Sequence, residues 1–446
     1  MPSPVTTQDP VLIVGAGITG LILAHALKQK SIPFTIYERD PTPSSRHQGW
    51  ALTLHWALQY LPSLLPTAVL SAIEAAQVDP VVAANDNGNF LFINNASGEV
   101  KWRIPPNRRW RVNRERLRRV LINGVEEGIV WGTRVEGVRY TDDEGGDEGG
   151  RGKGKPRLIL RRRVNNTNSN NSEERDEAGE ESESAPATLV VGTEGSRSSI
   201  RRFLCPDNYT NSPLPIRFTG VGISLSAAEV APLRAMDPLL FQGCHPETGV
   251  YFWFSMLDTP SPSQQTTAPS EAQPDPKTAE DEHRPYKVQL GLSWPVNSPD
   301  DEVPATDADR LANMKRRAEN FVPFLRDVIQ NIPEGTPVVD VKLADWNPGP
   351  WDNRDGTVTL VGDAAHAMTM YRGEACNHGI LDVYNLIGAI EAIYTGSDTS
   401  SAITEYEAEM RERGGRAVQL SRQACLDAHD WAALNEHSAI LARRKL

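Results

Sequence analysis

Side chains able to bind metals or transfer protons are concentrated between residues 361 and 380, in the stretch VGDAAHAMTMYRGEACNHGI. Five of them fall within sixteen positions: Asp363, His366, Glu374, Cys376 and His378. Such residues bind zinc when they cluster in space, and they also act as general acids and bases. A third alternative is a site that uses few of these side chains. The other motifs of the sequence are needed to distinguish these three kinds of site.

A glycine-rich turn near the N-terminus points to a nucleotide. Gly15, Gly17 and Gly20 form a GxGxxG pattern directly after the apolar run 11–14, which is typical of a buried strand. The glycines allow backbone N–H groups to approach a pyrophosphate, and the following helix start adds partial positive charge. Glu38 ends the next apolar run, eighteen residues after Gly20, about the spacing needed to bind a ribose diol. The pattern predicts a dinucleotide-binding βαβ unit for NAD or FAD, with a purely structural turn as the alternative.

Two further motifs stand where a predicted buried strand ends. The stretch ATLVVGTEGSRSSIRR gives a strand, then Gly192, the pair Glu194 and Gly195, and a helix start. The stretch TVTLVGD gives another strand that runs into Asp363. Both motifs follow the glycine-rich turn in a fixed order along the chain.

Hydrophobic periodicity predicts the other helices and strands. Residues 41–70 predict a loop followed by a helix, residues 89–104 a β-hairpin, and residues 113–125 a helix capped by Asn113. A helix is expected over residues 308–329, and residues 402–429 read as helical with a break at Gly414-Gly415.

Two aromatic and β-branched strands are expected at residues 249–257 and 286–296, joined as a long hairpin. Tyr251, Phe252, Trp253 and Phe254 follow one another in the first of them. Because side chains alternate across a strand, one pair should face a substrate cavity and the other should pack. We expect Tyr251 or Trp253 to face the ligand.

Composition excludes several functional classes. The chain has 446 residues and a net charge of −12, which disfavours general nucleic-acid binding. No apolar run is long enough to predict a membrane-spanning helix, and the N-terminal residues are not expected to form a signal peptide. The four cysteines are far apart and form no CxxC pair, as expected of reduced thiols in the cytoplasm. Residues 141–187 and 258–285 are rich in polar residues and are expected to be flexible insertions.

The three motifs in this order resemble those of the single-component FAD-dependent aromatic hydroxylases, typified by para-hydroxybenzoate and salicylate hydroxylases. The fungal members used in secondary metabolism are the most similar. The resemblance extends from Val11 to about Cys425 and excludes the polar insertions. It implies a Rossmann-like FAD-binding domain with an inserted mixed β-sheet substrate domain and C-terminal helices. The FAD-binding domain would comprise residues 1–70, 108–205 and 340–400, the substrate domain 71–107 and 206–339, and the helical segment 401–446.

The resemblance also implies roles for particular residues. Glu38 would bind the adenosine ribose, and Arg114 would contact the pyrophosphate or ribityl chain, to which Asp363 would also hydrogen-bond. Arg46 and the backbone near Ala51 would line the FAD. The backbone of residues 371–377, including Gly373 and Cys376, would present N–H groups at a helix start to the pyrimidine edge of the flavin ring, where reduced flavin carries negative charge.

This chain departs from the family pattern at three positions. Members typically have Asp where Glu194 stands, Pro where Met370 stands and Gly where Ala375 stands. A Cβ atom at residue 375 lies where the backbone should approach the flavin ring closely. These three departures are expected to affect the position of the flavin ring and, with it, the efficiency of oxygen activation.

The implied activity is hydroxylation of an electron-rich small molecule by a flavin C4a-hydroperoxide, using O₂ and NAD(P)H. With no second Rossmann unit, NAD(P)H would bind transiently. A phenolic substrate would need a base, for which Tyr251 and His55 are the candidates. Alternatives are an oxidase, an epoxidase or a Baeyer–Villiger-type enzyme on the same fold, or a degenerate FAD-binding protein. No metal, membrane or nucleic-acid partner is expected.

Overall fold

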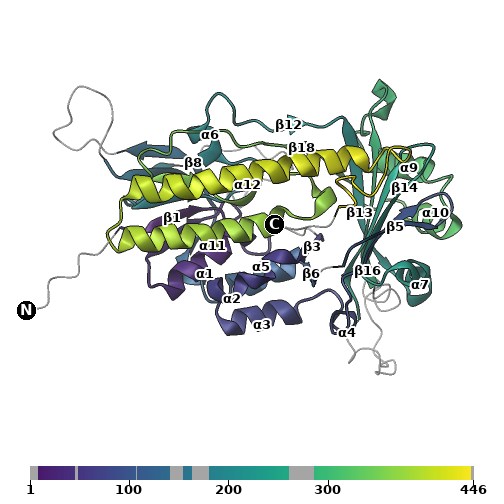
Figure 1. Ribbon diagram of the computed structural model, residues 1–446, viewed down its shortest axis with the longest axis horizontal. Coiled ribbons are helices and arrows are strands. Elements are labelled where there is room, and N and C mark those ends of the chain that lie inside the picture. The colour runs from purple at the N-terminus through teal and green to yellow at the C-terminus, as the bar shows by residue number, and fades with distance from the viewer. Residues whose placement is uncertain are drawn as a thin grey trace, which may run out of the picture.

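The computed structural model describes residues 9–45, 49–106, 108–140, 154–162, 180–260 and 286–442. Two β-sheets lie at opposite ends of the molecule, and two long helices run between them (Figure 1). Within these residues no helix combines the length and the apolar character needed to cross a membrane.

The first sheet forms the nucleotide-binding end. Its five strands are all parallel, in the order β19-β11-β1-β2-β7. They are β1 (Val11–Val14), β2 (Phe34–Tyr37), β7 (Ile129–Val130), β11 (Leu189–Gly192) and β19 (Val358–Leu360). Helices α1 (Ile18–Gln29), α5 (Arg114–Ile122) and α6 (Ser199–Leu204) pack around it. The three strands that carry the sequence motifs, β1, β11 and β19, are neighbours, and the predicted Rossmann-like domain is confirmed.

The second sheet is larger and mixed. Its seven strands have the order β17-β13-β16-β15-β14-β4-β5, with β14 and β4 parallel and the other pairs antiparallel. They are β4 (Phe90–Asn94), β5 (Val100–Ile104), β13 (Ile216–Leu225), β14 (Leu240–Cys244), β15 (Tyr251–Asp258), β16 (Tyr286–Pro295) and β17 (Val339–Val341). The hairpins predicted at residues 89–104 and at the two aromatic strands are confirmed.

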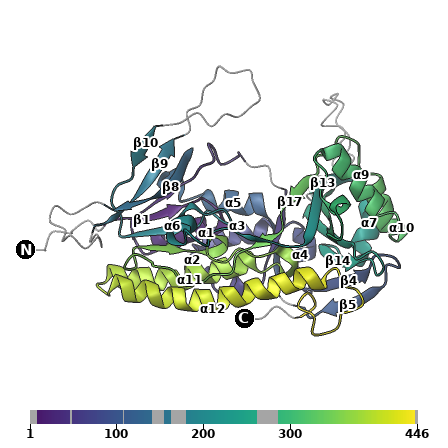
Figure 2. The ribbon, with the colours of Figure 1, turned by 90° about the horizontal axis from the view of Figure 1, so that it is seen from above.

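Three helices cover the outer face of this second sheet (Figure 2). They are α7 (Ala227–Met236), α9 (Asp307–Arg317) and α10 (Pro323–Gln330). The single helix expected over residues 308–329 is therefore wrong. Pro323 stands at the first position of α10, where its missing N–H costs nothing, so a new helix starts there.

Smaller elements connect the two sheets. Strands β3 (Ala51–Leu54) and β6 (Trp110–Asn113) pair antiparallel, and β3 was not anticipated in the region expected to be loop and helix. Helices α2 (Leu61–Leu64) and α3 (Thr67–Ala75) follow β3. Strands β8 (Thr133–Tyr140), β9 (Pro156–Arg162) and β10 (Glu181–Glu183) form a third sheet. Within the predicted insertions, residues 141–153, 163–179 and 261–285 lie outside the described residues.

Helices α11 (Ala375–Tyr394) and α12 (Thr399–Asp427) run side by side along the molecule, and α12 reaches the second sheet (Figures 1 and 2). The break predicted at Gly414-Gly415 is wrong, because α12 is continuous through both glycines. A Cβ atom on Gly414 would come within 2.7 Å of the His366 ring. Gly414 lets the helix pack closely against the turn that carries Asp363.

Candidate active site

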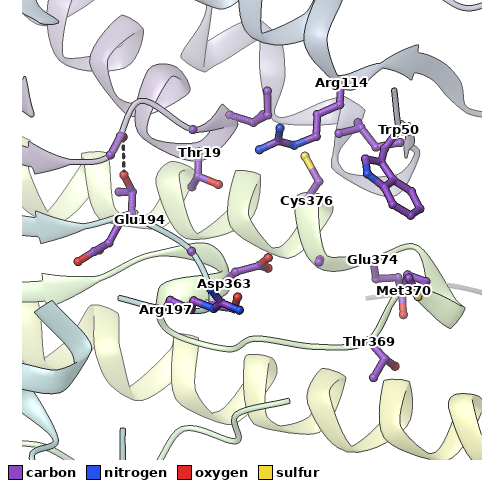
Figure 3. Close-up of a pocket in the computed structure, with 18 of the residues that line it drawn as sticks. Thr19, Trp50, Arg114, Glu194, Arg197, Asp363, Thr369, Met370, Glu374 and Cys376 are labelled. Atoms are coloured by element: carbon purple, nitrogen blue, oxygen red, sulfur yellow. Dashed lines mark hydrogen bonds between the residues drawn. The ribbon is translucent and has the colours of Figure 1, made fainter. Parts of the chain in front are cut away.

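One large cavity of about 1120 Å³ extends from the first sheet to the second. Its walls come from the glycine-rich turn, the loop after β11, the turn after β19, strands β3 and β6, the start of α11, and the inner face of β15. Figure 3 shows Thr19 and Glu194 toward one end of this cavity and Trp50 and Met370 toward the other. The cavity therefore continues from the nucleotide-binding motifs to the aromatic strand of the second sheet.

At two positions of the glycine-rich turn, any residue larger than glycine would clash with the backbone. Gly15 has φ +104°, and a Cβ on it would come within 2.9 Å of the Glu194 backbone. A Cβ on Gly20 would lie only 2.3 Å from the Gly15 carbonyl oxygen. Gly17 differs, because its Cβ would meet nothing in the protein closer than 3.8 Å. Gly17 leaves open space on the cavity side, as close approach of a ligand requires.

Glu38 ends β2 beside this turn and is buried. Its carboxylate accepts hydrogen bonds from the Ala16 N–H at 2.7 Å and the Asp40 N–H at 2.9 Å. Arg118 of α5 donates from Nε to the Ala16 carbonyl at 2.9 Å. Glu38 and Arg118 thus hold the turn from both sides. Arg118 was not expected to contact the turn, although it stands one helical turn after Arg114 on the same helix.

Three residues from three different elements point into the middle of the cavity: Arg114, Asp363 and Cys376 (Figure 3). The surrounding protein raises the pKa of Asp363 by desolvation, while His366, Arg114 and Arg201 counteract this by their charge. Burial, with the nearby Asp363, raises the pKa of the Cys376 thiol to about 12. The thiol therefore stays protonated at neutral pH, which argues against a nucleophile or a metal ligand.

The two histidines of the opening stretch belong to a buried network beneath the cavity. His366 Nε2 lies 2.6 Å from Asp382 Oδ2, and Arg413 donates to Asp382 Oδ1 at 2.7 Å. Arg413 Nη1 lies 3.0 Å from His378 Nδ1, and burial together with the charges of His366 and Arg413 lowers the pKa of His378 to about 2. His366 therefore braces the turn after β19. Among the described residues no His, Cys, Asp or Glu cluster could hold a metal ion.

The segment before α11 forms the wall nearest the second sheet. Gly373 has φ +65° and ends a short helical turn, after which α11 begins at Ala375. Glu374 is buried and accepts a hydrogen bond from Arg372 Nε at 2.6 Å. The side chains of Met370 and Ala375, where this chain departs from the family pattern, line the cavity.

Glu194 makes contacts that a shorter acid would not reach in the same position. Its Oε1 atom accepts hydrogen bonds from the Ile200 N–H at 2.9 Å and from Ser199 Oγ at 3.0 Å, both in the first turn of α6. Burial raises the pKa of Glu194, and these hydrogen bonds partly offset that effect. The extra methylene relative to Asp thus lets the carboxylate reach the start of α6.

Both residues predicted as catalytic bases line the cavity. The backbone N–H of His55 donates to Asn377 Oδ1 at 2.9 Å, and its Nε2 atom lies 3.4 Å from the Gly373 carbonyl oxygen. Tyr251 donates from its hydroxyl to Gln242 Oε1 at 2.8 Å within the second sheet. Their catalytic roles stay predictions.

The predicted alternation in β15 is found in the structure. Tyr251 and Trp253 line the cavity, whereas Phe252 and Phe254 are buried in the core between the sheet and its outer helices. Ala51, Arg114, Asp363, Gly373 and Cys376 also lie on the cavity wall. Arg46 lies outside the described residues.

The walls fit FAD at the nucleotide end. The open face of Gly17 leaves room for a pyrophosphate, and the turn is followed by the N-terminus of α1, which has no acidic residue in its first turn. Glu38 and Asp363 place carboxylates on the cavity wall, where they would be able to accept hydrogen bonds from hydroxyl groups of the ribose and ribityl parts. The first turn of α11 lies farther along the cavity, where a ring system would follow.

Comparisons with known proteins agree with this geometry. A family described as "FAD binding domain" matches residues 351–421, and one described as "NAD(P)-binding Rossmann-like domain" matches residues 13–68. A "Probable FAD-dependent monooxygenase" of Arthroderma benhamiae is 39% identical over 98% of this chain and 96% of its own length. The "FAD-dependent monooxygenase dbaB" of Emericella nidulans is 39% identical over 89% of this chain and 90% of its own.

Solved structures share the fold at low sequence identity. A putative FAD-containing monooxygenase from Photorhabdus luminescens has a TM-score of 0.71 and 22% identity, covering 96% of this chain and 100% of that one. The 2,6-dihydroxypyridine-3-hydroxylase of Arthrobacter nicotinovorans has a TM-score of 0.67 and 15% identity, covering 98% and 97%. At these identities the likeness establishes the architecture alone.

Proposed function

This chain belongs to the FAD-dependent monooxygenases, and we propose that it uses NAD(P)H and O₂ to hydroxylate an electron-rich aromatic, phenolic or polyketide-like molecule. We also place the reaction in the cytosol and in secondary metabolism, as the sequence and its resemblance to the fungal members of the family imply. One observation carries the proposal: a single cavity runs from the nucleotide-binding turn to the aromatic face of β15. A substrate ring on that face would lie beside the part of the cavity that a flavin ring would occupy.

The residues on the walls have separable tasks in this proposal. Gly17, Glu38, Arg114 and Asp363 would hold the FAD, and the start of α11 would favour negative charge on its ring. Bound FAD would supply the redox chemistry that passes electrons from NAD(P)H to O₂. Tyr251 and Trp253 would form an apolar wall that orients the substrate ring and excludes water from the reacting atoms.

A phenolic substrate also needs to lose a proton to become more electron-rich. His55 is one candidate base, since its ring lies on the cavity wall next to the start of α11. Tyr251 is the other candidate. Its hydroxyl donates to Gln242 Oε1, and it would accept a proton from the substrate only in its ionised form.

The proposal is tested with purified protein in three steps. It should carry FAD, candidate aromatic substrates should stimulate its NADPH consumption, and ¹⁸O₂ should leave one labelled atom in the product. A hydroxylated product supports hydroxylation, whereas an epoxide or an ester supports the corresponding alternative. An oxidised product without label identifies an oxidase. Protein that binds FAD but turns over none of the candidates would overturn the proposal in favour of a degenerate FAD-binding protein.

A further inference from the structure

A buried arginine on the cavity wall has no acidic partner in the part of the chain that the structure describes. Arg111 of β6 is only 4% exposed. Its Nη1 donates to Thr53 Oγ1 at 2.8 Å and its Nη2 to Ser255 Oγ at 2.6 Å, and both acceptors are neutral hydroxyls. Its Nε–H is buried and has no hydrogen-bond acceptor among the described residues. Burying a cation without a compensating anion is costly, so an unpaired one calls for an explanation.

Two other buried arginines on the cavity wall have acidic partners. Arg109, two residues before Arg111, makes a bidentate pair with Asp86 at 2.7 and 3.1 Å. Arg372 is paired with Glu374. A third, Arg201 of α6, donates to two neutral oxygens, but it lies at the nucleotide-binding end of the cavity. The electrostatic neighbour of Arg111 is the cation Arg109, which together with the larger effect of burial lowers the pKa of Arg111 to about 9. Arg111 is therefore still a cation at neutral pH.

The position of Arg111 indicates which ligand meets it. Its partner Ser255 lies on β15, and its guanidinium lies 5.8 Å from the centre of the Trp253 ring. Its other partner, Thr53, accepts a hydrogen bond through its carbonyl oxygen from Asn377 in the first turn of α11. Arg111 thus stands between the aromatic wall and the start of α11. The glycine-rich turn, where a pyrophosphate would bind, belongs to the other sheet.

We propose that Arg111 is the anion-binding residue of the substrate site, and that the substrate carries an anionic oxygen, either a carboxylate or an ionised phenol. The remaining N–H groups of the terminal nitrogens would donate to that oxygen, in the charge-assisted geometry that arginine forms with such groups. This inference rests on the proposed function, because it places a substrate at the aromatic end of the cavity. Beyond the proposed function, it specifies that the substrate is negatively charged.

The test measures the charge preference of the FAD-loaded enzyme by titration calorimetry without NADPH. Two ligand pairs serve as probes: 6-hydroxy-2-naphthoate with its methyl ester, and ionised 4-nitrophenol with 4-nitroanisole. In at least one pair the wild type should bind the anion about 10- to 100-fold more tightly than the neutral partner. The first pair reports a carboxylate subsite and the second a phenolate subsite.

Substitution assigns the preference to one residue. Arg111→Met should abolish it by weakening anion binding, while affinity for the neutral partner changes less than about threefold. Arg111→Lys should keep part of it. Lys342→Met is the matched control, since Lys342 also lines the cavity but is already paired with Asp340 and should leave the preference unchanged. FAD content and thermal unfolding establish that each variant is folded.

Two outcomes would overturn the inference. One is a wild type that prefers neither anion, including a wild type that binds none of the four probes. The other is a preference for the anion that survives in Arg111→Met. If that variant also loses FAD affinity, Arg111 is assigned to the flavin instead of the substrate. Because binding is measured without turnover, the charge preference can be determined even if the protein hydroxylates no candidate substrate.

Discussion

His366 and Asp382 form a fully buried pair in which Nε2 of the imidazole lies 2.6 Å from Oδ2 of the carboxylate. The same Oδ2 atom accepts the Gly362 N–H at 2.7 Å. Arg413 of α12 completes the cluster by donating to Oδ1. The turn that carries Asp363 into the cavity is therefore tied to both long helices through one carboxylate, although Asp382 itself does not line the cavity.

Asp382→Asn should destabilise the protein and release FAD together. Burial opposes ionisation, but His366 and Arg413 hold the pKa of Asp382 well below its ordinary value, so the charge is lost with the substitution. Removing one partner of a buried ion pair costs about 3 to 5 kcal/mol. Denaturant unfolding with and without FAD measures the loss. Asn385→Ala breaks an exposed contact to Glu409 between the same two helices and should cost far less. Equal losses would show that the carboxylate is unimportant.

Gly414→Ala should destabilise the protein, because the new methyl group would come within 2.7 Å of the His366 ring. Overpacking of this kind costs about 1 to 3 kcal/mol. Gly388→Ala is the control in α11, since a Cβ there meets nothing within 4 Å. That substitution should stabilise the protein by about 0.5 to 1 kcal/mol. Thermal unfolding of both variants tests the pair, and stabilisation by both would contradict the packing role of Gly414.

The pH dependence of stability should contain a contribution from His429. Burial lowers the pKa of His429 to about 4, against a smaller opposing effect of its hydrogen bond to the Cys425 carbonyl. Because the unfolded state takes up the proton first, the contribution is fully present above pH 6.5 and is lost as the pH falls toward 4. It amounts to roughly 3 kcal/mol.

His429→Gln should therefore flatten the stability curve over this range while lowering stability at pH 7. Denaturant unfolding between pH 4 and pH 7 measures both effects. His437→Gln provides the control, because the His437 side chain is 88% exposed. Parallel curves for wild type and His429→Gln would assign the acid sensitivity to other groups.

Motifs that depend on local geometry were predictable from the sequence. The turn after Val14, the cap at Asn113 and the alternation from Tyr251 to Phe254 need only neighbouring residues, and each is found as expected. The helix break at Gly414 was mispredicted because glycine weakens an isolated helix yet permits close packing in a folded one. Propensity alone does not distinguish these cases.

The features that were missed depend on contacts between distant segments. Arg111 is an ordinary basic residue in the sequence. Only the folded structure, where β3, β6 and β15 meet, shows that it has no acidic partner among the described residues. That His366 braces the loop instead of transferring protons was expected from the sequence. Its partner Asp382, and the Arg413 that joins Asp382 to His378, could not be identified from sequence spacing.

Gly17→Ala should leave the fold intact and weaken FAD binding. The backbone of Gly17 has φ −77° and ψ 178°, which alanine adopts without strain, and its Cβ would meet no protein atom closer than 3.8 Å. Stability without FAD should therefore stay the same or rise by about 0.4 to 1 kcal/mol. The methyl group would instead occupy the space that a pyrophosphate needs, so FAD affinity should fall at least about tenfold.

Gly20→Ala is the contrasting variant in the same turn. Its Cβ would lie 2.3 Å from the Gly15 carbonyl oxygen and 2.6 Å from Thr193 Oγ1, so the turn itself must shift. This variant should lose stability even without FAD. Flavin fluorescence quenching measures FAD affinity, and denaturant unfolding of the FAD-free proteins measures stability. If Gly17→Ala retained normal FAD affinity, the pyrophosphate would not bind against this turn, and the cofactor would have to occupy the cavity in another orientation.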